Sequence, residues 1–352
     1  MLRTLVTCLV GFFPLAALNA APPDFAPADA LVQKWIDARN YPGSGLWVTD
    51  RAGRTLHERY WGGYDRGRTV MIASASKWLE AATVMALVDE GKLDLDKPIA
   101  TYLPELAGAA GTNTLRQIFS HTSSLNSIEL PRDKSLADTD HFPALLARGS
   151  TDVRPGAVFS YGGTALAVAA RAIEVVTGKP WLTVFAEKIA KPCRMKATVT
   201  GHNLWTFSGI VGGDNFPCSN AADYMNFLQM LLNDGVFEGK RVLSAAAVRE
   251  MQANQIGKAV VKRPEYIERA LQQTHHGVYG LGEWRMLVDD AGEAVVLSSP
   301  SFAGFFPWID KKRGIAGVFV GRASGGIDAF HASAALVPLV GRAVDERDAA
   351  QK

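Results

Sequence analysis

Residues 72–77, Ile-Ala-Ser-Ala-Ser-Lys, lead directly into residues 78–88, Trp-Leu-Glu-Ala-Ala-Thr-Val-Met-Ala-Leu-Val. Apolar residues recur in this stretch at helical spacing, and Gly91 follows where a helix is expected to end. The pattern predicts a buried helix with Ser74 at its N-terminus. Lys77 lies three residues after Ser74, and at that spacing the two side chains share one face of the helix.

A serine and a lysine in this arrangement suit nucleophilic catalysis. A serine hydroxyl is a weak nucleophile until a base takes its proton, and burial can lower the pKa of a lysine until it serves as that base. The N-terminus of a helix also favours a developing anion through its partial positive charge and its free N–H groups. The plainer interpretation is that Ser74 only caps the helix and that Lys77 is a solvated residue of the first turn, since an S-x-x-K pattern occurs by chance about once in a chain of this length.

The composition narrows the classes of function. The chain has 352 residues, 48% of them hydrophobic, and a formal net charge of +2. It can therefore bury a large core, and it lacks the charge imbalance of a nucleic-acid-binding surface or an acidic tail. Its three cysteines do not cluster with histidines, which argues against a structural zinc site. We expect no nucleic-acid partner, no metal and no organic cofactor.

The first 20 residues predict export. A basic start followed by an apolar run to Leu18 is typical of a secretory signal peptide, with cleavage after Ala20. The run is short for a membrane anchor, and no later stretch could span a bilayer. We therefore expect a periplasmic or secreted protein without stable membrane insertion once the signal is removed. Cys8 would leave with the signal, and we expect Cys193 and Cys218 to form a disulfide in the oxidising compartment.

The two ends of the chain carry strand patterns, and the middle is mainly helical. Strands at both ends imply one sheet built from both ends of the chain. Within residues 21–352 we expect a sheet lobe at about 30–91 and 271–345 and a helical lobe at about 92–270. The expected strands cover 45–50, 54–61, 278–287, 294–297, 302–309 and 315–320, and the expected helices outside the Ser74 stretch cover 31–38, 115–120, 164–176, 220–233 and 328–344.

A second candidate lies in the loop 155–163, Pro-Gly-Ala-Val-Phe-Ser-Tyr-Gly-Gly. A tyrosine at a glycine-rich corner can approach a reacting centre closely, and its hydroxyl can relay a proton when a cationic lysine is near. Taken alone, Tyr161 is more simply a buried tyrosine that hydrogen-bonds a loop.

In combination, these segments resemble the serine hydrolases related to class C β-lactamases, a family that includes DD-peptidases and carboxylesterases. The resemblance implies an α/β fold of the β-lactamase/transpeptidase type, an antiparallel sheet flanked by helices with an inserted helical lobe. It covers most of the chain after residue 20. It rests on the order and spacing of residues 72–77 with 87–96, 118–125 (where Ser124 replaces a family glycine), 155–161, 165–178 with 192–195, 219–223 and 279–282.

The resemblance also implies roles for individual residues. Ser74 would be the nucleophile, Lys77 its base partner and Tyr161 the proton relay. The family's third motif usually begins with lysine or histidine on a strand that lines the site, and it falls here at residues 299–301, Ser-Pro-Ser. The backbone N–H groups of Ser74 and Phe302 would then form the oxyanion hole.

Two departures from the family pattern bear on substrate recognition. The second motif often ends in an asparagine that holds a substrate amide, and Gly163 occupies that place here. The third motif carries Ser299 where the family has a cation or an imidazole, so Ser299 and Ser301 offer a substrate only hydroxyl groups. Arg322 is an alternative source of a cation, and we expect His121 to be a structural turn residue rather than a base.

We therefore expect an exported serine hydrolase that cleaves an ester or amide through a Ser74 acyl-enzyme, with esterase-like activity favoured. A neutral short-chain ester needs no carboxylate contact, and Phe302, Phe305 or Phe306 would supply an apolar acyl pocket. Two alternatives remain open: a β-lactamase or D-alanyl-D-alanine peptidase, and a non-catalytic binding protein on the same fold. The expected partner is a small-molecule ester, amide or peptide substrate.

Overall fold

The computed structural model describes residues 22–106, 108–127, 152–200, 217–262, 268, 271–273, 275–324 and 329–350. The expected signal peptide, residues 1–20, lies outside the described residues. No helix in those ranges combines the length and the apolar composition that crossing a membrane requires.

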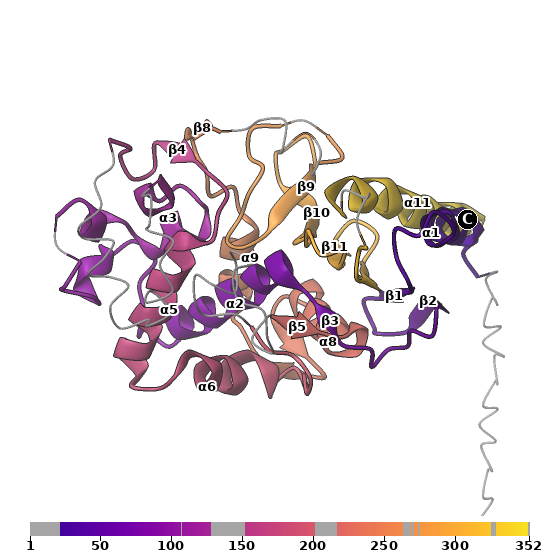
Figure 1. Cartoon of the computed structure of the whole chain (residues 1–352), viewed down its shortest axis with the longest axis horizontal. Coiled ribbons are helices and arrows are strands. Elements are labelled where there is room, and N and C mark those ends of the chain that lie inside the picture. The colour runs from indigo at the N-terminus through magenta and orange to yellow at the C-terminus, as the bar shows by residue number, and fades with distance from the viewer. Residues whose placement is uncertain are drawn as a thin grey trace, which may run out of the picture.

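A six-stranded antiparallel sheet joins the two ends of the chain (Figure 1). Its strand order is β2-β1-β12-β11-β10-β9, and Leu46 on β1 pairs with Phe319 on β12. The expected antiparallel sheet built from both ends of the chain is confirmed. Its strands are β1 (Ser44–Asp50), β2 (Thr55–Trp61), β9 (Trp284–Val288), β10 (Ala294–Ser298), β11 (Phe306–Asp310) and β12 (Ile315–Gly321).

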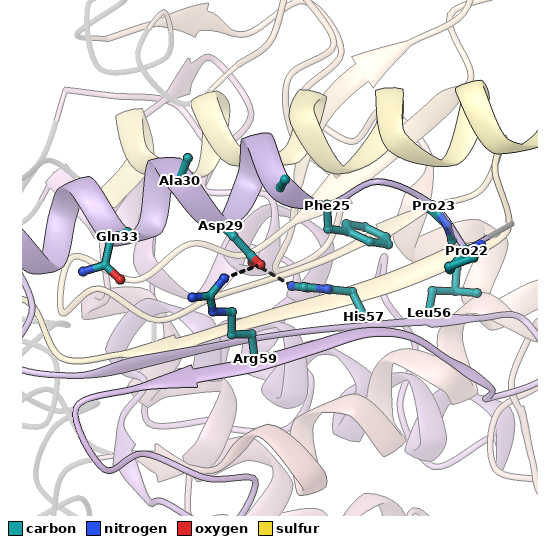
Figure 2. Close-up of a pocket in the computed structure, with 10 residues that line it drawn as sticks. Pro22, Pro23, Phe25, Asp29, Ala30, Gln33, Leu56, His57 and Arg59 are labelled. Carbon is teal, nitrogen blue, oxygen red and sulfur yellow. Dashed lines mark hydrogen bonds and ion pairs between the residues drawn. The ribbon is translucent and has the colours of Figure 1, made fainter.

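Helices α1 (Ala26–Asp37) and α11 (Ala329–Ala350) lie together on one side of this sheet (Figure 1). They bury apolar side chains against it, and Trp35 of α1 meets Phe319 edge-to-face with ring centroids 5.6 Å apart. Polar contacts also fix α1. Figure 2 shows the Asp29 carboxylate between His57 and Arg59 of β2, at 2.8 Å and 2.9 Å.

Helix α2 (Ser76–Asp89) lies in the middle of the molecule (Figure 1). Every residue from Ser76 to Leu87 is buried. A helix that is covered on all sides needs apolar or paired side chains all round. The helices around it are α3 (Leu115–Phe119), α5 (Thr164–Thr177), α6 (Trp181–Phe185), α8 (Ala221–Leu232) and α9 (Ala245–Gln252).

Short elements connect these layers. Strand β3 leads into the Ser74 turn and pairs with β5, where Met71 lies opposite Cys218. The short strands are β3 (Val70–Met71), β4 (Val158–Phe159), β5 (Cys218–Ser219), β6 (Val236–Phe237), β7 (Lys240–Arg241) and β8 (Val260–Val261). Short 3₁₀ helices cover Ala73–Ala75, Ile99–Thr101, Ala110–Thr112 and Ser124–Ser127, and a π-helical turn covers Ala186–Ala190.

Two strands are shorter than predicted, because a tight turn occupies the first residues of each predicted range. Residues 278–283 turn before β9, and Gly282 there has a φ of +75°. Residues 301–304 turn before β11, where the Ser301 N–H donates to the Phe305 carbonyl at 2.8 Å. The terminal helices, in contrast, are longer than expected: α1 begins at Ala26 and α11 ends at Ala350.

The expected disulfide is wrong. Cys193 and Cys218 are both free thiols. Cys193 is fully buried in the hydrophobic core of the helical region, whereas Cys218 is held in β5 by its pairing with Met71. Different neighbours therefore fix the two thiols, and burial raises the pKa of each.

Candidate active site

Ser74 lies in a single 3₁₀ turn that leads into α2, at 8% exposure. The residue before it, Ala73, has a φ of +37°, in the left-handed region that alanine rarely adopts. Such backbone strain persists only where the surrounding structure holds it in place. Part of that support comes from α8, because the Tyr224 hydroxyl donates to the Ala75 carbonyl at 2.6 Å. The turn thus presents Ser74 from a fixed backbone.

Lys77 is the buried partner of this serine. Its Nζ atom lies 3.5 Å from Ser74 Oγ, and the side chain is 1% exposed. Burial lowers the pKa of Lys77, and the charge of Glu80 opposes that effect in part. The predicted pair therefore has the distance and the environment in which a lysine amine can take a proton from a serine hydroxyl.

Tyr161 completes the predicted constellation. Lys77 Nζ lies over its ring, 4.9 Å from the centroid. Burial raises the pKa of the Tyr161 phenol to about 12, although the Ser74 hydroxyl and the Trp284 indole act in the opposite direction. The phenol therefore keeps its proton near neutral pH, which suits a proton relay better than a resting base. The structure brings Ser74, Lys77 and Tyr161 together as the sequence predicted.

An aromatic cluster holds the Tyr161 ring in place. The His121 ring lies 4.6 Å from it, the Trp284 ring 5.1 Å and the Tyr279 ring 5.9 Å, centroid to centroid. The Gly162 N–H donates to His121 Nδ1 at 3.5 Å. Burial, with a smaller contribution from the charge of Lys77, lowers the pKa of His121 well below its ordinary value. His121 is thus a neutral support for the Tyr161 loop, which agrees with the expected structural role.

The third-motif serines contact the backbone around the site. The Ser299 hydroxyl donates to the carbonyls of Ser74 and Gly282, at 3.1 Å and 3.3 Å. The Ser301 hydroxyl accepts the Ala303 N–H at 3.0 Å. Both serines are fully buried, and their hydroxyls hold the backbone in place. The substrate contacts expected of Ser299 and Ser301 stay a prediction.

The predicted oxyanion hole has suitable free donors. Neither the Ser74 N–H nor the Phe302 N–H donates to another backbone carbonyl within the described ranges. The Phe302 side chain is 60% exposed, whereas Phe305 and Phe306 are fully buried in the core. Of the three phenylalanines expected to form an acyl pocket, Phe302 alone is therefore accessible. Gly163 lies directly before α5 and offers no side chain.

Sequence reasoning missed two buried carboxyl groups near this site. Glu80 lies on α2, one turn after Lys77, and is 4% exposed. Glu283 is fully buried beside Trp78, and burial raises its pKa well above its ordinary value. The sequence did contain a signal for the first of them, because Glu80 interrupts the apolar run 78–88. Across the described residues, no group of three acidic, histidine or cysteine side chains could hold a metal ion.

Comparisons with known proteins agree with this geometry. The family model described as Beta-lactamase matches residues 28–340. The chain belongs to the beta-lactamase family. A solved structure of a candidate beta-lactamase from Bacteroides dorei is 36% identical, with a TM-score of 0.83 over 92% of this chain and 99% of the other. The family fold implied by the sequence motifs is thereby confirmed.

Curated relatives within the beta-lactamase family carry different names. Penicillin-binding protein 4 of Amycolatopsis lactamdurans is 30% identical over 255 residues, which cover 61% of this chain and 66% of that protein. Esterase EstB of Burkholderia gladioli is 27% identical over 198 residues, which cover 49% of this chain and 50% of that protein. The matches thus span between half and two thirds of these relatives, and the family includes both penicillin-binding proteins and esterases.

Proposed function

We propose that this chain is an exported serine hydrolase that cleaves an ester or amide through an acyl-enzyme formed on Ser74. The observation that carries the proposal is the 3.5 Å approach of Lys77 Nζ to Ser74 Oγ, with the lysine buried and its pKa lowered. A nucleophile with an adjacent base of lowered pKa is the arrangement that covalent catalysis requires.

The proposed reaction has two stages. In acylation, Ser74 Oγ bonds to the substrate carbonyl carbon while its proton passes to Lys77, and the N–H groups of Ser74 and Phe302 stabilise the oxyanion. The leaving group then departs with a proton relayed through Tyr161. In deacylation, a water molecule attacks the ester, and the same groups return the proton to Ser74.

Esterase-like activity is favoured because the site offers little to a substrate carboxylate. The Ser299 and Ser301 hydroxyls are occupied by backbone contacts, and Gly163 supplies no amide. A cationic contact on the third-motif strand would contribute roughly 1.5–3 kcal/mol to binding a carboxylate. The exposed Phe302 side chain instead offers apolar contact to an acyl group.

A β-lactamase or D-alanyl-D-alanine peptidase is the second candidate, and the similarity to penicillin-binding protein 4 favours it. A non-catalytic binding protein on the same fold is the third, since the third motif departs from the family pattern. These candidates differ in turnover and in substrate, so two measurements separate them.

A fluorophosphonate probe tests the enzyme assignment. We expect it to label the wild-type protein once, at Ser74, and to leave Ser74→Ala unlabelled. Ser333→Ala is the control, because it removes a buried serine on α11, on the side of the sheet away from α2. Labelling that persists in Ser74→Ala would overturn the assignment of the nucleophile, and an unlabelled wild-type protein would favour the binding protein.

Substrate preference is tested with one enzyme preparation. We expect a higher kcat/KM for p-nitrophenyl acetate or butyrate than for nitrocefin or a D-alanyl-D-alanine peptide. A clear preference for either substrate that carries a carboxylate would replace the esterase proposal with the second candidate.

Export is the remaining part of the proposal, and it rests on the predicted signal peptide at residues 1–20. We expect the protein recovered from the periplasm or the medium to begin at Ala21. Intact-mass measurement gives the answer directly, and a chain that retains residues 1–20 in the cytoplasm would contradict it.

A further inference from the structure

Three polar side chains follow one another at steps of three along the start of α2: Ser74, Lys77 and Glu80. Residues three apart are neighbours on the surface of a helix. Lys77 is therefore a neighbour of Ser74, and Glu80 is a neighbour of Lys77. Lys77 and Glu80 are 1% and 4% exposed. The first two turns of α2 therefore carry a buried base next to Ser74 and a buried acid next to that base.

Burying these two groups is costly unless each offsets the charge of the other. Burial raises the pKa of Glu80 and lowers the pKa of Lys77, and each charge opposes the shift of its partner. One carboxylate oxygen, Glu80 Oε1, accepts no hydrogen bond within the described part of the chain. Its interaction with the lysine is thus a principal compensation for its burial.

Other groups face this pair from the neighbouring elements. Tyr161 and His121 lie toward Lys77. The Tyr161 phenol is protonated near neutral pH, and the His121 ring is neutral. The Ser76 hydroxyl and Tyr224 of α8 lie toward Glu80. None of these four is an acid that would be ionised near neutral pH, so Glu80 is the acidic group among the neighbours of Lys77.

We propose that Glu80 is a positioning residue for the reaction, the third member of a Ser74–Lys77–Glu80 series in which its carboxylate stabilises the ammonium that forms on Lys77. The inference rests on the proposed function. It follows the general logic of a nucleophile, a base and a third group that supports the base.

The charge balance of the step explains the role. When Ser74 attacks, the Oγ–H bond breaks, the proton binds Lys77 Nζ, and a C–O bond forms while the carbonyl electron pair moves to oxygen. A neutral buried amine thus becomes a buried cation. In its carboxylate form Glu80 lowers the free energy of that cation. A buried lysine without it would be easier to deprotonate but a weaker base.

Glu80→Gln tests this role because it keeps the size of the side chain and removes the charge. The measurement is the pH dependence of the rate of labelling by the fluorophosphonate probe. We expect the acid limb of the profile to move to lower pH by about 1 unit or more, because Lys77 loses the charge that raises its pKa. We also expect the plateau rate to fall by about tenfold or more, because the base is weaker.

Glu283→Gln is the matched control. It also removes a fully buried carboxyl beside α2, but Glu283 lies against Trp78. We expect its acid limb to stay at the wild-type pH. A purely structural role for Glu80 would lower the plateau without moving the limb, so an unmoved limb in folded Glu80→Gln overturns the proposal.

A measurement on the wild-type protein covers the case in which Glu80→Gln does not fold. In protein labelled with ¹³C-lysine, the Lys77 Cε resonance is assigned by its absence from Lys77→Arg and followed over pH. An amine that is neutral on the activity plateau and becomes an ammonium along the acid limb supports the stabilising carboxylate, and an amine that stays neutral over the whole pH range overturns it. Because this titration needs no turnover, it separates failure of the Glu80 role from failure of the proposed hydrolase.

Discussion

A side-chain carbon on Gly282 would lie 2.3 Å from the carbonyl oxygen of Lys77. The turn before β9 therefore packs directly against the backbone of the nucleophile helix, and its position is fixed further by a 3.0 Å bond from the Gly282 N–H to the Phe119 carbonyl. The Ser299 hydroxyl bridges the same turn to the Ser74 carbonyl. The site is thus held by backbone contact as well as by side chains.

This contact predicts that Gly282→Ala is more destabilising than a comparable change elsewhere. Gly292 is the matched control, because its φ of +79° is close to the +75° of Gly282 and a Cβ there meets open space. We expect Gly292→Ala to lower the free energy of unfolding by about 1 kcal/mol through backbone strain alone. Overpacking should add roughly 1–3 kcal/mol in Gly282→Ala. Urea unfolding of both variants measures the difference, and equal losses would contradict the close contact.

Removing either proton-transfer group should reduce turnover with little effect on the fold. We expect Lys77→Ala and Tyr161→Phe each to lower kcat/KM for an ester by about 10² to 10⁴. Tyr102→Phe is the control, because it also removes one tyrosine hydroxyl, here one that accepts the Asp94 N–H at 2.8 Å, outside the site. Steady-state kinetics with circular dichroism distinguish the cases. Wild-type rates in Tyr161→Phe would exclude its role as a relay.

The Asp29 carboxylate should make stability depend on pH in acid. Burial alone would raise its pKa, but the hydrogen bonds and charges of His57 and Arg59 outweigh burial and lower it (Figure 2). Because the pKa is lower in the folded state, the stabilising contribution is full above roughly pH 4 and is lost as the pH falls through the folded-state value.

Asp29→Asn should therefore unfold more easily at neutral pH, by about 1 kcal/mol. Its free energy of unfolding should also fall less than that of the wild type between neutral pH and about pH 3. The control is Asp37→Asn, since Asp37 lies on the same helix and is exposed. If Asp29→Asn and Asp37→Asn gave the same profile, the contacts of Asp29 with β2 would not stabilise the fold.

Arg322 is the remaining source of a cation for a substrate carboxylate. It is exposed at the end of β12, and the N–H of the next residue, Ala323, donates to the Ala303 carbonyl of the third-motif turn at 2.7 Å. We expect Arg322→Gln to change kcat/KM for p-nitrophenyl butyrate by less than about twofold. If Arg322 binds the substrate carboxylate, kcat/KM of Arg322→Gln for nitrocefin should fall by about tenfold or more. Equal effects on both substrates would exclude that role.

Local signals explain what the sequence predicted well. The Ser74 helix and its end near Gly91 depend on apolar spacing and on a glycine with a φ of +68°. The helix closed by Gly178 is similar, with a φ of +66° at that glycine. The spacing of Ser74 and Lys77 is also local. Such features need no knowledge of distant contacts.

Distant contacts decide what the sequence did not predict. The hydroxyl of Ser299 bonds to the carbonyl of Ser74, which lies far away in the sequence, so the residue type alone could not show this contact. Glu80 is similar. The apolar pattern predicted a buried helix, but only the elements that cover α2 on all sides reveal that the glutamate is buried together with Lys77.

The pairing of Leu46 with Phe319 also sets the time at which this protein can fold. The two residues enter the chain at opposite ends of its synthesis, which at roughly 5–20 residues per second places them on the order of tens of seconds apart. Until β12 exists, β1 has β2 on one side and no strand on the other, and the loop that must close contains most of the chain, which slows folding. The turn before β9 that supports Lys77 is also made late. Ser74 is therefore synthesised early, but the residues of the turn before β9 and of the third motif reach it only when the chain is almost complete.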